Sequence, residues 1–176
     1  MDCTQAIRAR RSIRKYKPGA PVPEEDIRLM LEAAMMAPSA RNTRPWEFFV
    51  VEDPELKAKL RSAHPFASML DTASLAIVVC GRPENQSGKA EGYWPLDCGA
   101  AVENLLLQAT ALGYGCCWCG CWPSPRAAAL QELLNTRSVP TALIAVGVPD
   151  EEPPARGFYE PEKVTWLRGQ GGPVHG

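Results

Sequence analysis

The stretch Ala37–Val51, APSARNTRPWEFFVV, contains the signals that decide the fold. Pro38 lacks a backbone N–H and disfavours helical geometry at Ala37, so a preceding helix has to end there. Small and polar residues follow, and after Pro45 an apolar, aromatic run begins at Trp46 that is typical of a strand. We therefore expect a helix, a polar elbow (residues 37–45) and a strand. The elbow either turns at the surface or presents backbone groups and short side chains to a ligand.

The composition is that of an ordinary globular protein with one domain. The chain has 176 residues, of which 45% are apolar and 22% charged. A net charge of −1 gives no indication of nucleic acid or an anionic membrane as a partner. The first twenty residues carry charges throughout, and the apolar run Leu105–Leu107 is interrupted by Gln108, so we expect neither an export signal nor a transmembrane span. We expect a cytoplasmic location and seven cysteines that are mostly thiols.

Helices and strands alternate around the elbow. Upstream, Pro23 and the acidic residues after it begin a helix that buries one apolar face. Downstream, the run Leu75–Cys80 and the run Ala142–Val148 are typical of buried strands. Between them, apolar residues cover nearly the whole circumference of a helix at Asp97–Leu112. Either part of this helix packs against a second copy of the chain, or its own sheet and helices surround it.

A basic cluster follows the first predicted helix, Thr4–Arg11, which Asp2 can cap. Cations suit the negative end of a helix dipole, which is the structural interpretation. The sequence RRSIR at residues 10–14 also places several guanidinium groups and a serine hydroxyl within a few positions. These groups are suited to holding a phosphate by charge-assisted hydrogen bonds. Both interpretations are open at this point. The cluster consists of Arg8, Arg10, Arg11, Arg14 and Lys15.

Gly113 and Gly115 turn the chain into CCWCGCW, residues 116–122. The cysteine density invites a metal or disulfide interpretation. Tetrahedral metal sites are normally built from two separated pairs, however, and no second Cys or His pair is spaced to complete one. Since cysteine also packs as a small hydrophobe, we favour a place in the core. A lone histidine, His64, is interpreted as a surface residue without a role.

The chain from Pro149 onward is rich in proline and too polar for a core of its own. It predicts an extended arm in which Lys163–Arg168 forms a short strand that has to find its sheet elsewhere. We expect one domain over residues 1–168, including this arm, and a flexible tail at residues 169–176.

Five passages, in this order, resemble the nitroreductase family of FMN-dependent oxidoreductases in its short form. They are AIRARRSIRKY, APSARNTRPWEFFVV, DCGAAVENLLLQATALGYG, CCWCGC and the arm that ends in EKVTWLR. The resemblance runs from about Ala6 to Arg168. It implies an α/β (α+β) three-layer sandwich with a mixed central sheet flanked by helices. It also implies an intertwined homodimer, in which the C-terminal arms are exchanged and two FMN sites lie at the interface.

The resemblance assigns FMN contacts to three groups of residues. The phosphate and ribityl chain are held by Arg10, Arg11, Ser12 and Arg14, joined by Arg168. The elbow approaches the flavin from the other subunit through Pro38, Ser39 and Asn42. A turn whose backbone lies beside the flavin ring contains Trp118, Cys119, Gly120 and Cys121.

The implied activity is that of an FMN-dependent NAD(P)H oxidoreductase. Reduced nicotinamide would pass a hydride to FMN N5, and a small acceptor such as a nitroaromatic or quinone would then take the electrons in a ping-pong mechanism. Because the cofactor carries the chemistry, no catalytic residue and no metal ligand is assigned. The sequence identifies neither the physiological acceptor nor the choice between NADH and NADPH. Nucleic acid and membranes are not expected partners.

Two departures from the family pattern stand out. Arg44 occupies a position where glutamine is common, which makes it a candidate for acceptor binding or for a positive charge beside the flavin. The cysteines of residues 116–121 exceed the usual number, and Cys119 or Cys121 would be redox-active only in an electropositive, exposed setting. The alternatives are a dehalogenase or flavin-degrading enzyme on the same scaffold, or a non-catalytic flavin-binding or cysteine-based redox or metal module.

Overall fold

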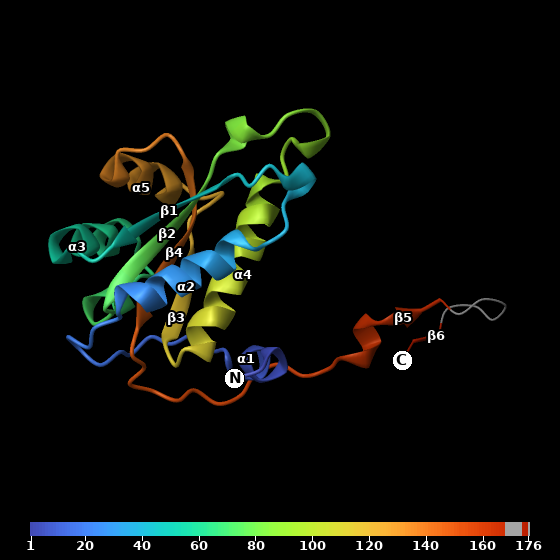
Figure 1. Ribbon diagram of the computed structural model, residues 1–176, viewed down its shortest axis with the longest axis horizontal. Coiled ribbons are helices and arrows are strands. Elements are labelled where there is room, and N and C mark those ends of the chain that lie inside the picture. Colours follow the sequence, from blue (N-terminus) through green and yellow to red (C-terminus); the bar gives the residue numbers. More distant parts are fainter. Residues whose placement is uncertain (168–173, 176) are drawn as a thin grey trace.

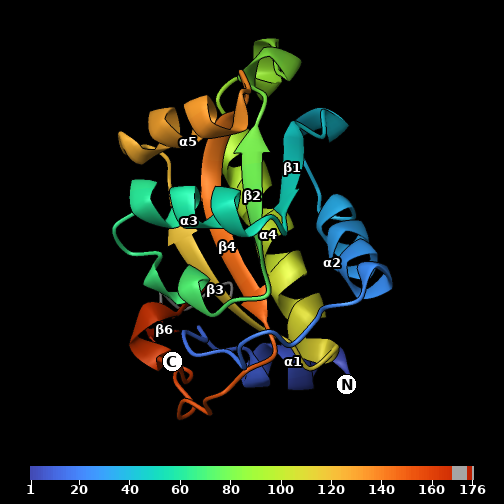
Figure 2. The same cartoon turned by 90° about the vertical axis from the view of Figure 1, so that its left-hand side faces the viewer.

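A four-stranded antiparallel sheet forms the middle of three layers (Figures 1 and 2). The computed structural model describes residues 1–167 and 174–175. The strands lie in the order β1–β2–β4–β3, with bounds Trp46–Val51 (β1), Leu75–Gly81 (β2), Val139–Gly147 (β4) and Gly115–Gly120 (β3). One face of the sheet is covered by α2 (Glu24–Met35) and α4 (Trp94–Ala111), the other by α3 (Pro54–Ala63) and α5 (Arg126–Leu134). The expected three-layer α/β sandwich is confirmed.

Strand β2 joins the two cores, because every one of its residues is buried. Successive side chains of a strand point to opposite faces. Ile77 and Val79 accordingly belong to the core under α2 and α4, whereas Val78 and Cys80 belong to the core under α3 and α5. The continuous apolar run that predicted a buried strand thus reflects burial on both faces of the sheet.

Helix α4 is surrounded mainly by its own chain. Its buried side chains follow a helical stripe that packs against α2, α1 (Cys3–Ala9) and the sheet. Leu105 and Leu106 lie in that stripe, whereas Leu96 is 69% exposed. Burial by the sheet and helices of its own chain, the second of the two alternatives for this helix, therefore accounts for most of its apolar surface. In the described ranges 1–167 and 174–175, no helix is both long and apolar enough to cross a membrane.

The segment after α1 runs along the open edge of β3. Ser12 forms an isolated parallel bridge with Cys116, and the Ile13 N–H donates to the Cys116 carbonyl at 2.8 Å. This bridge adds the parallel pairing that makes the sheet mixed at its edge. Further along, the buried Tyr16 bridges Pro149, where the C-terminal arm begins. Residues 11–17 are thus fixed between β3 and the arm.

The stretch from Cys116 to Gly120 is an edge strand rather than the expected turn. Cysteine and glycine give it a weak strand pattern, and its conformation comes from pairing with β4, which begins at Val139. Helix α4 also begins at Trp94, before the expected Asp97. Strand pairing explains the first difference, because it decides the conformation where the local strand signal is weak. The second difference has a local signal, because Pro95 lies in the first turn of the helix, where proline is favoured.

The C-terminal arm leaves the body of the protein below α1 and extends away from it (Figure 1). It ends in β5 (Thr165–Trp166), which pairs with β6 (Val174–His175) of the same chain. The strand expected at residues 163–168 therefore has a partner within its own chain. Phe158, at 83% exposed, packs little against the body. Arg168 and the tail residues 169–173 and 176 lie outside the described residues.

We predict that Gly115→Ala destabilises the fold because the added methyl group displaces residues 11–14 from β3. A Cβ at Gly115 would lie 2.8 Å from Ile13 Cβ, and atoms this close must move apart. Overpacking of this kind costs about 1–3 kcal/mol, measurable as a lower urea midpoint.

The matched control is Gly120→Ala in the same strand, where an added Cβ meets no atom within 4 Å. We expect its free energy of unfolding to stay within about 0.5 kcal/mol of the original. Equal stability of the two variants would contradict the tight contact at Gly115.

Candidate functional site

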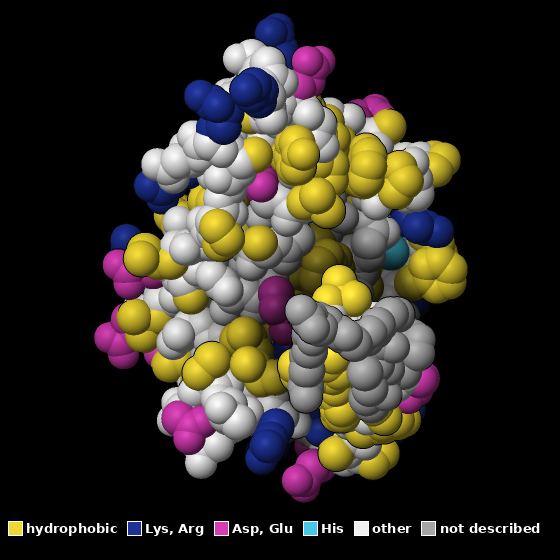
Figure 3. Space-filling model, turned by 90° about the vertical axis from the view of Figure 1, so that its right-hand side faces the viewer, with side chains coloured by type: hydrophobic (Ala, Val, Ile, Leu, Met, Phe, Trp, Pro, Cys, Tyr) yellow, Lys and Arg dark blue, Asp and Glu magenta, His cyan; other side chains and the backbone are white. Residues whose placement is uncertain are grey.

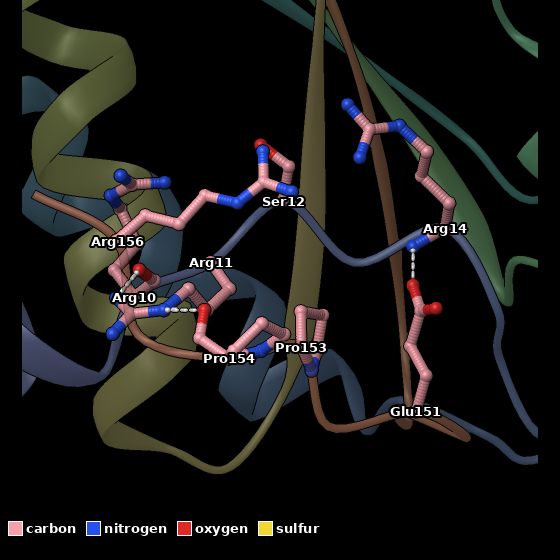
Figure 4. Close-up of a pocket in the computed structure, with 8 residues that line it drawn as sticks. All are labelled: Arg10, Arg11, Ser12, Arg14, Glu151, Pro153, Pro154 and Arg156. Atoms are coloured by element: carbon pink, nitrogen blue, oxygen red, sulfur yellow. Dashed lines mark hydrogen bonds between the residues drawn. The ribbon is translucent and has the colours of Figure 1, made fainter.

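An arginine-rich cavity of about 280 Å³ lies between the N-terminal segment and the arm (Figure 4). We call it the arginine cavity. It is lined by Arg10, Arg11, Ser12, Arg14, Glu151, Pro153, Pro154 and Arg156. The predicted phosphate-binding residues are therefore brought together, with the exception of Arg168, which lies outside the described residues. The arm supplies Arg156, which extends toward Ser12.

Two of the arginines in this cavity already have protein partners. Arg11 donates through Nε to the Pro154 carbonyl at 3.2 Å and through Nη1 to the Arg10 carbonyl at 2.6 Å. Arg10 forms an ion pair with Glu103, with Nε 3.5 Å from Oε1. Arg11 thus ties the arm to the N-terminal segment while its charge stays in the cavity.

Glu151 is the one carboxylate among the residues that line the arginine cavity. Its Oε1 accepts hydrogen bonds from the backbone N–H groups of Arg14 and Lys15. The carboxylate therefore shapes the backbone at Arg14, and four guanidinium groups still leave the cavity positive. Such a setting favours an anion with several acceptor oxygens, such as a phosphate.

A second, larger cavity of about 610 Å³ lies along β3 and shares Arg14 with the first. We call it the strand cavity. It is lined by Arg14, His64, Pro65, Phe66, Ser68, Met69, Cys117, Trp118, Cys119, Gly120 and Arg126. Since Arg14 lines both cavities, the two are neighbours on either side of this residue. Trp118, Cys119 and Gly120, predicted to lie beside a ring, all face this cavity.

The edge of β3 supplies backbone donors to the strand cavity. In an antiparallel ladder, alternate residues direct their N–H and C=O groups toward the neighbouring strand. Cys116 points its carbonyl outward to Ile13, and the Cys121 N–H points inward to the Thr141 carbonyl at 2.9 Å. Trp118 and Gly120 are two and four residues after Cys116, so their backbone groups point the same way as those of Cys116. Their N–H groups therefore face the open edge of the sheet. Cys121 is fully buried and lines neither cavity, so its predicted ring contact is not seen in the chain.

The cysteines of this strand divide between the two cores. Cys116 packs with α2 and α4, whereas Cys117, Cys119 and Cys121 pack with α3 and α5. Burial raises the pKa of Cys116 and that of Cys121 to about 12. Within the described ranges, no three His, Cys, Asp or Glu side chains are grouped to hold a metal ion.

Cys117 differs from its neighbours in its electrostatic setting. A hydrogen bond from the Cys119 thiol and the nearby Arg14 guanidinium lower the pKa of Cys117 to about 7, against the effect of burial. The same interaction raises the pKa of Cys119. Only 2% of Cys117 is exposed, so its thiol lies in an electropositive setting but is not accessible from solvent, as a reactive thiol has to be.

His64 is buried, and its interpretation as a surface residue is wrong. Its Nε2 lies 3.0 Å from the Gly120 carbonyl and fixes the end of β3. Its Nδ1 is buried without a hydrogen-bond partner in the described part of the chain. The ring stands edge-on to Phe66 at 6.2 Å between centroids. The contact between His64 and Gly120 joins residues 56 positions apart, so the local sequence gives no signal for it.

The elbow lies away from the arginine cavity, near the other end of α4 (Figure 1). Its conformation is held by Asp97 in α4, whose Oδ1 accepts from the Ala40 N–H at 3.0 Å. Asp97 Oδ2 accepts from the Gln86 side-chain amide at 2.7 Å. Asn42 is exposed and has a φ of 55°, in the left-handed region. Neither cavity is lined by the predicted elbow residues Pro38, Ser39 and Asn42.

Arg44 also has a left-handed backbone, with φ 48°. Its N–H donates to Ser39 Oγ at 3.0 Å, and its guanidinium lies over the Trp46 ring at 6.0 Å from Cζ to the centroid. The exposed side chain therefore belongs to the elbow surface and to neither cavity.

Sequence reasoning missed several residues that line the two cavities. Glu151 and Arg156 follow β4 in a segment whose path cannot be read from local pattern. Phe66 comes from the connection after α3 and Arg126 from the first turn of α5, and the two meet only in the fold. The signal available was composition: an arginine within the proline-rich arm and an aromatic residue in a polar segment. The missed residues are His64, Phe66, Arg126, Glu151 and Arg156.

Comparison with known proteins finds relatives that carry nitroreductase names. A protein of Methanothermobacter thermautotrophicus named NADH dehydrogenase/NAD(P)H nitroreductase is 39% identical over 167 residues, 93% of this chain and 86% of the relative. A crystal structure of a protein with the same name from Parabacteroides distasonis is 36% identical, with a TM-score of 0.86 and coverage of 92% and 95% of the two chains. A nitroreductase from Desulfovibrio desulfuricans, solved in complex with FMN, is 30% identical, with a TM-score of 0.80 and coverage of 93% and 95%.

The model of the nitroreductase family matches residues 7–65 and 62–148, which include the end of α1, all of α2 to α5 and the four strands of the main sheet. The match contains the resembling passages between residues 7 and 121, whereas the arm after residue 148 lies beyond it. With this match and relatives above 30% identity across most of the chain, the protein belongs to the nitroreductase family.

Proposed function

We propose that the protein is an FMN-dependent NAD(P)H oxidoreductase. Reduced nicotinamide would pass a hydride to FMN N5, and a nitroaromatic, a quinone or a similar small acceptor would then take the electrons in a ping-pong mechanism. The FMN-bound Desulfovibrio structure and the NAD(P)H nitroreductase name of the archaeal relative support the proposal.

The observation that carries this proposal is the junction of two unlike cavities at Arg14. The arginine cavity fits a phosphate, since guanidinium groups and the Ser12 hydroxyl surround it. The strand cavity fits a flat ring, since Phe66 and the edge of β3 form its walls. The two cavities together therefore offer a place for the phosphate of FMN and a place for its ring, with Arg14 between them.

When bound, FMN supplies the redox chemistry, and the protein supplies position and charge. The outward N–H groups of Trp118 and Gly120 would orient the ring edge, and His64 holds the Gly120 carbonyl in place. Arg14 would place positive charge between the phosphate and the ring. Preorganised donors of this kind favour the form of the ligand that carries more negative charge.

We further propose a homodimer in which the elbow of one subunit completes the site of the other through Pro38, Ser39 and Asn42. Hydrophobic side chains gather on the face that carries α4 and the arm (Figure 3). The exposed apolar residues of the protein include Met36, Tyr93, Leu96 and Trp122. Exposed apolar side chains that gather on one face favour association with a partner. The extended arm would reach the second subunit and bring Arg168 toward an FMN phosphate.

Purified protein tests the proposal directly. We expect a yellow protein that releases FMN on denaturation and oxidises NADH or NADPH when a nitroaromatic or quinone is supplied. Colourless protein with stoichiometric zinc or iron would instead favour a cysteine-based metal module. A yellow protein without activity toward these acceptors would favour the dehalogenase, flavin-degrading or non-catalytic alternatives.

We predict that Arg14→Ala weakens FMN binding by about 10- to 100-fold, the equivalent of about 1.5–3 kcal/mol for a lost hydrogen bond to a charged group. Arg14 is the one residue common to both cavities. Titration of apo-protein with FMN, followed by flavin fluorescence, measures the change.

The matched control is Arg8→Ala, which removes an exposed arginine of α1 that lines neither cavity. Its dissociation constant for FMN is expected to stay within about twofold of the original. Full flavin retention by Arg14→Ala would refute the assignment of this arginine.

We predict that Arg44→Gln changes acceptor preference and leaves FMN content unchanged. The side chain is exposed on the elbow, so its loss removes positive charge without opening a core. The KM for an anionic nitroaromatic should rise relative to that for a neutral analogue of the same shape. Unchanged reduction rates and acceptor preference would remove Arg44 from the site.

A further inference from the structure

A second cation faces the strand cavity from the side of α5. Arg126 is the first residue of that helix, and its Cζ lies 5.1 Å from the centroid of the Phe66 ring. Its Nη1 lies 3.3 Å from Ser124 Oγ, which fixes the other end of the guanidinium. Phe66 is 66% exposed, so this stacked pair stands at the surface of the cavity and not within a core.

The charge of Arg126 has no carboxylate partner in the described part of the chain. The residues that line the strand cavity include Arg14 and Arg126 and no Asp or Glu. Stacking on an exposed aromatic ring is worth about 0.5–1 kcal/mol, which holds the side chain but does not neutralise its charge. The cavity therefore has a surplus of positive charge and of N–H donors.

The available hydrogen-bonding groups have a pattern. Donors are present on Arg14, Arg126 and the outward N–H groups of β3, whereas acceptors are few. Arginine presents its N–H groups in a planar fork suited to carbonyl and anionic oxygens. A flat ring bearing carbonyl oxygens complements such donors. The pyrimidine edge of a flavin has two carbonyls and gains negative charge on reduction, whereas its dimethylbenzene edge is apolar.

We propose that Arg126 contacts the pyrimidine edge of the bound flavin, together with Arg14, and stabilises the reduced, anionic form over the oxidised form. The inference rests on the proposed FMN site and assigns it a binding residue and a ring orientation. Two cations without an acid between them favour the more negative state of a ligand, because a cavity wall screens charge less than bulk water does. Phe66 acts as a positioning residue, since it holds the guanidinium in place.

The test compares the two-electron midpoint potential of bound FMN in the original protein and in Arg126→Gln. We expect the affinity for reduced FMN to fall about tenfold more than that for oxidised FMN, equivalent to a shift of about 30 mV toward more negative potential. The affinity for oxidised FMN, from titration of the apo-protein, should change little. Arg126→Lys keeps the charge and should recover most of the potential.

The matched control is Arg137→Gln, an exposed arginine beyond the end of α5 that does not line the cavity. Its potential should equal that of the original protein. If Arg126→Gln does not fold, Phe66→Leu provides the test, because it removes the stacking surface and should shift the potential in the same direction by a smaller amount.

The outcomes separate this inference from the proposed function. FMN bound with the same potential in the original protein, Arg126→Gln and Phe66→Leu would overturn the role of Arg126 and leave the flavin enzyme standing. Failure of the original protein to bind FMN would overturn both. A shift of equal size in Arg137→Gln would show a general effect of surface charge and would also overturn the inference.

Discussion

The close contact between the N-terminal segment and β3 determines the geometry of the candidate site. Ile13 lies against Gly115 in a space that admits no side chain, and its N–H donates to the Cys116 carbonyl. This contact leaves the rest of the β3 edge open and places Arg14 beside that open part. Glu151 accepts hydrogen bonds from the backbone N–H groups of Arg14 and Lys15, which brings the arm to the same point. One edge contact thus aligns three segments that are distant in sequence.

The elbow depends on a different constraint, a buried carboxylate. Arg41, Asn42 and Arg44 all have positive φ, and each such residue costs on the order of 1 kcal/mol. Asp97 offsets part of this cost by accepting from the Ala40 N–H. Gln86 completes the arrangement, since its amide donates to Asp97 and its carbonyl accepts from the Trp94 N–H at 2.7 Å. The strained loop is thus held at the N-terminal turn of α4.

The parts of the fold that sequence predicted are those with strong local signals. Pro38 ended α2 as expected, and the apolar runs of β2 and β4 needed no knowledge of their neighbours. Strand β3 was missed because its cysteines and glycines have little strand preference, so pairing decides its conformation. The site residues also divide into those with a local sequence signal and those placed by long-range contacts. The RRSIR arginines stood out in the sequence as a basic cluster, and the resemblance to the family assigned them to a phosphate, whereas Arg156 and Arg126 reach the cavities only through long-range packing.

The residues of β3 can be understood from what the two sides of an edge strand require. The side chains facing α3 and α5 must be small and apolar, because Leu143 and Met69 leave little room, and cysteine meets this requirement. A carboxylate at position 117 or 119 would neutralise Arg14, and a lysine would repel it. Meanwhile the N–H groups of Trp118 and Gly120 have to stay directed toward the cavity, while His64 holds the Gly120 carbonyl. Cysteine density in this strand therefore follows from packing beside a cation, and it leaves the positive charge of Arg14 available to a ligand.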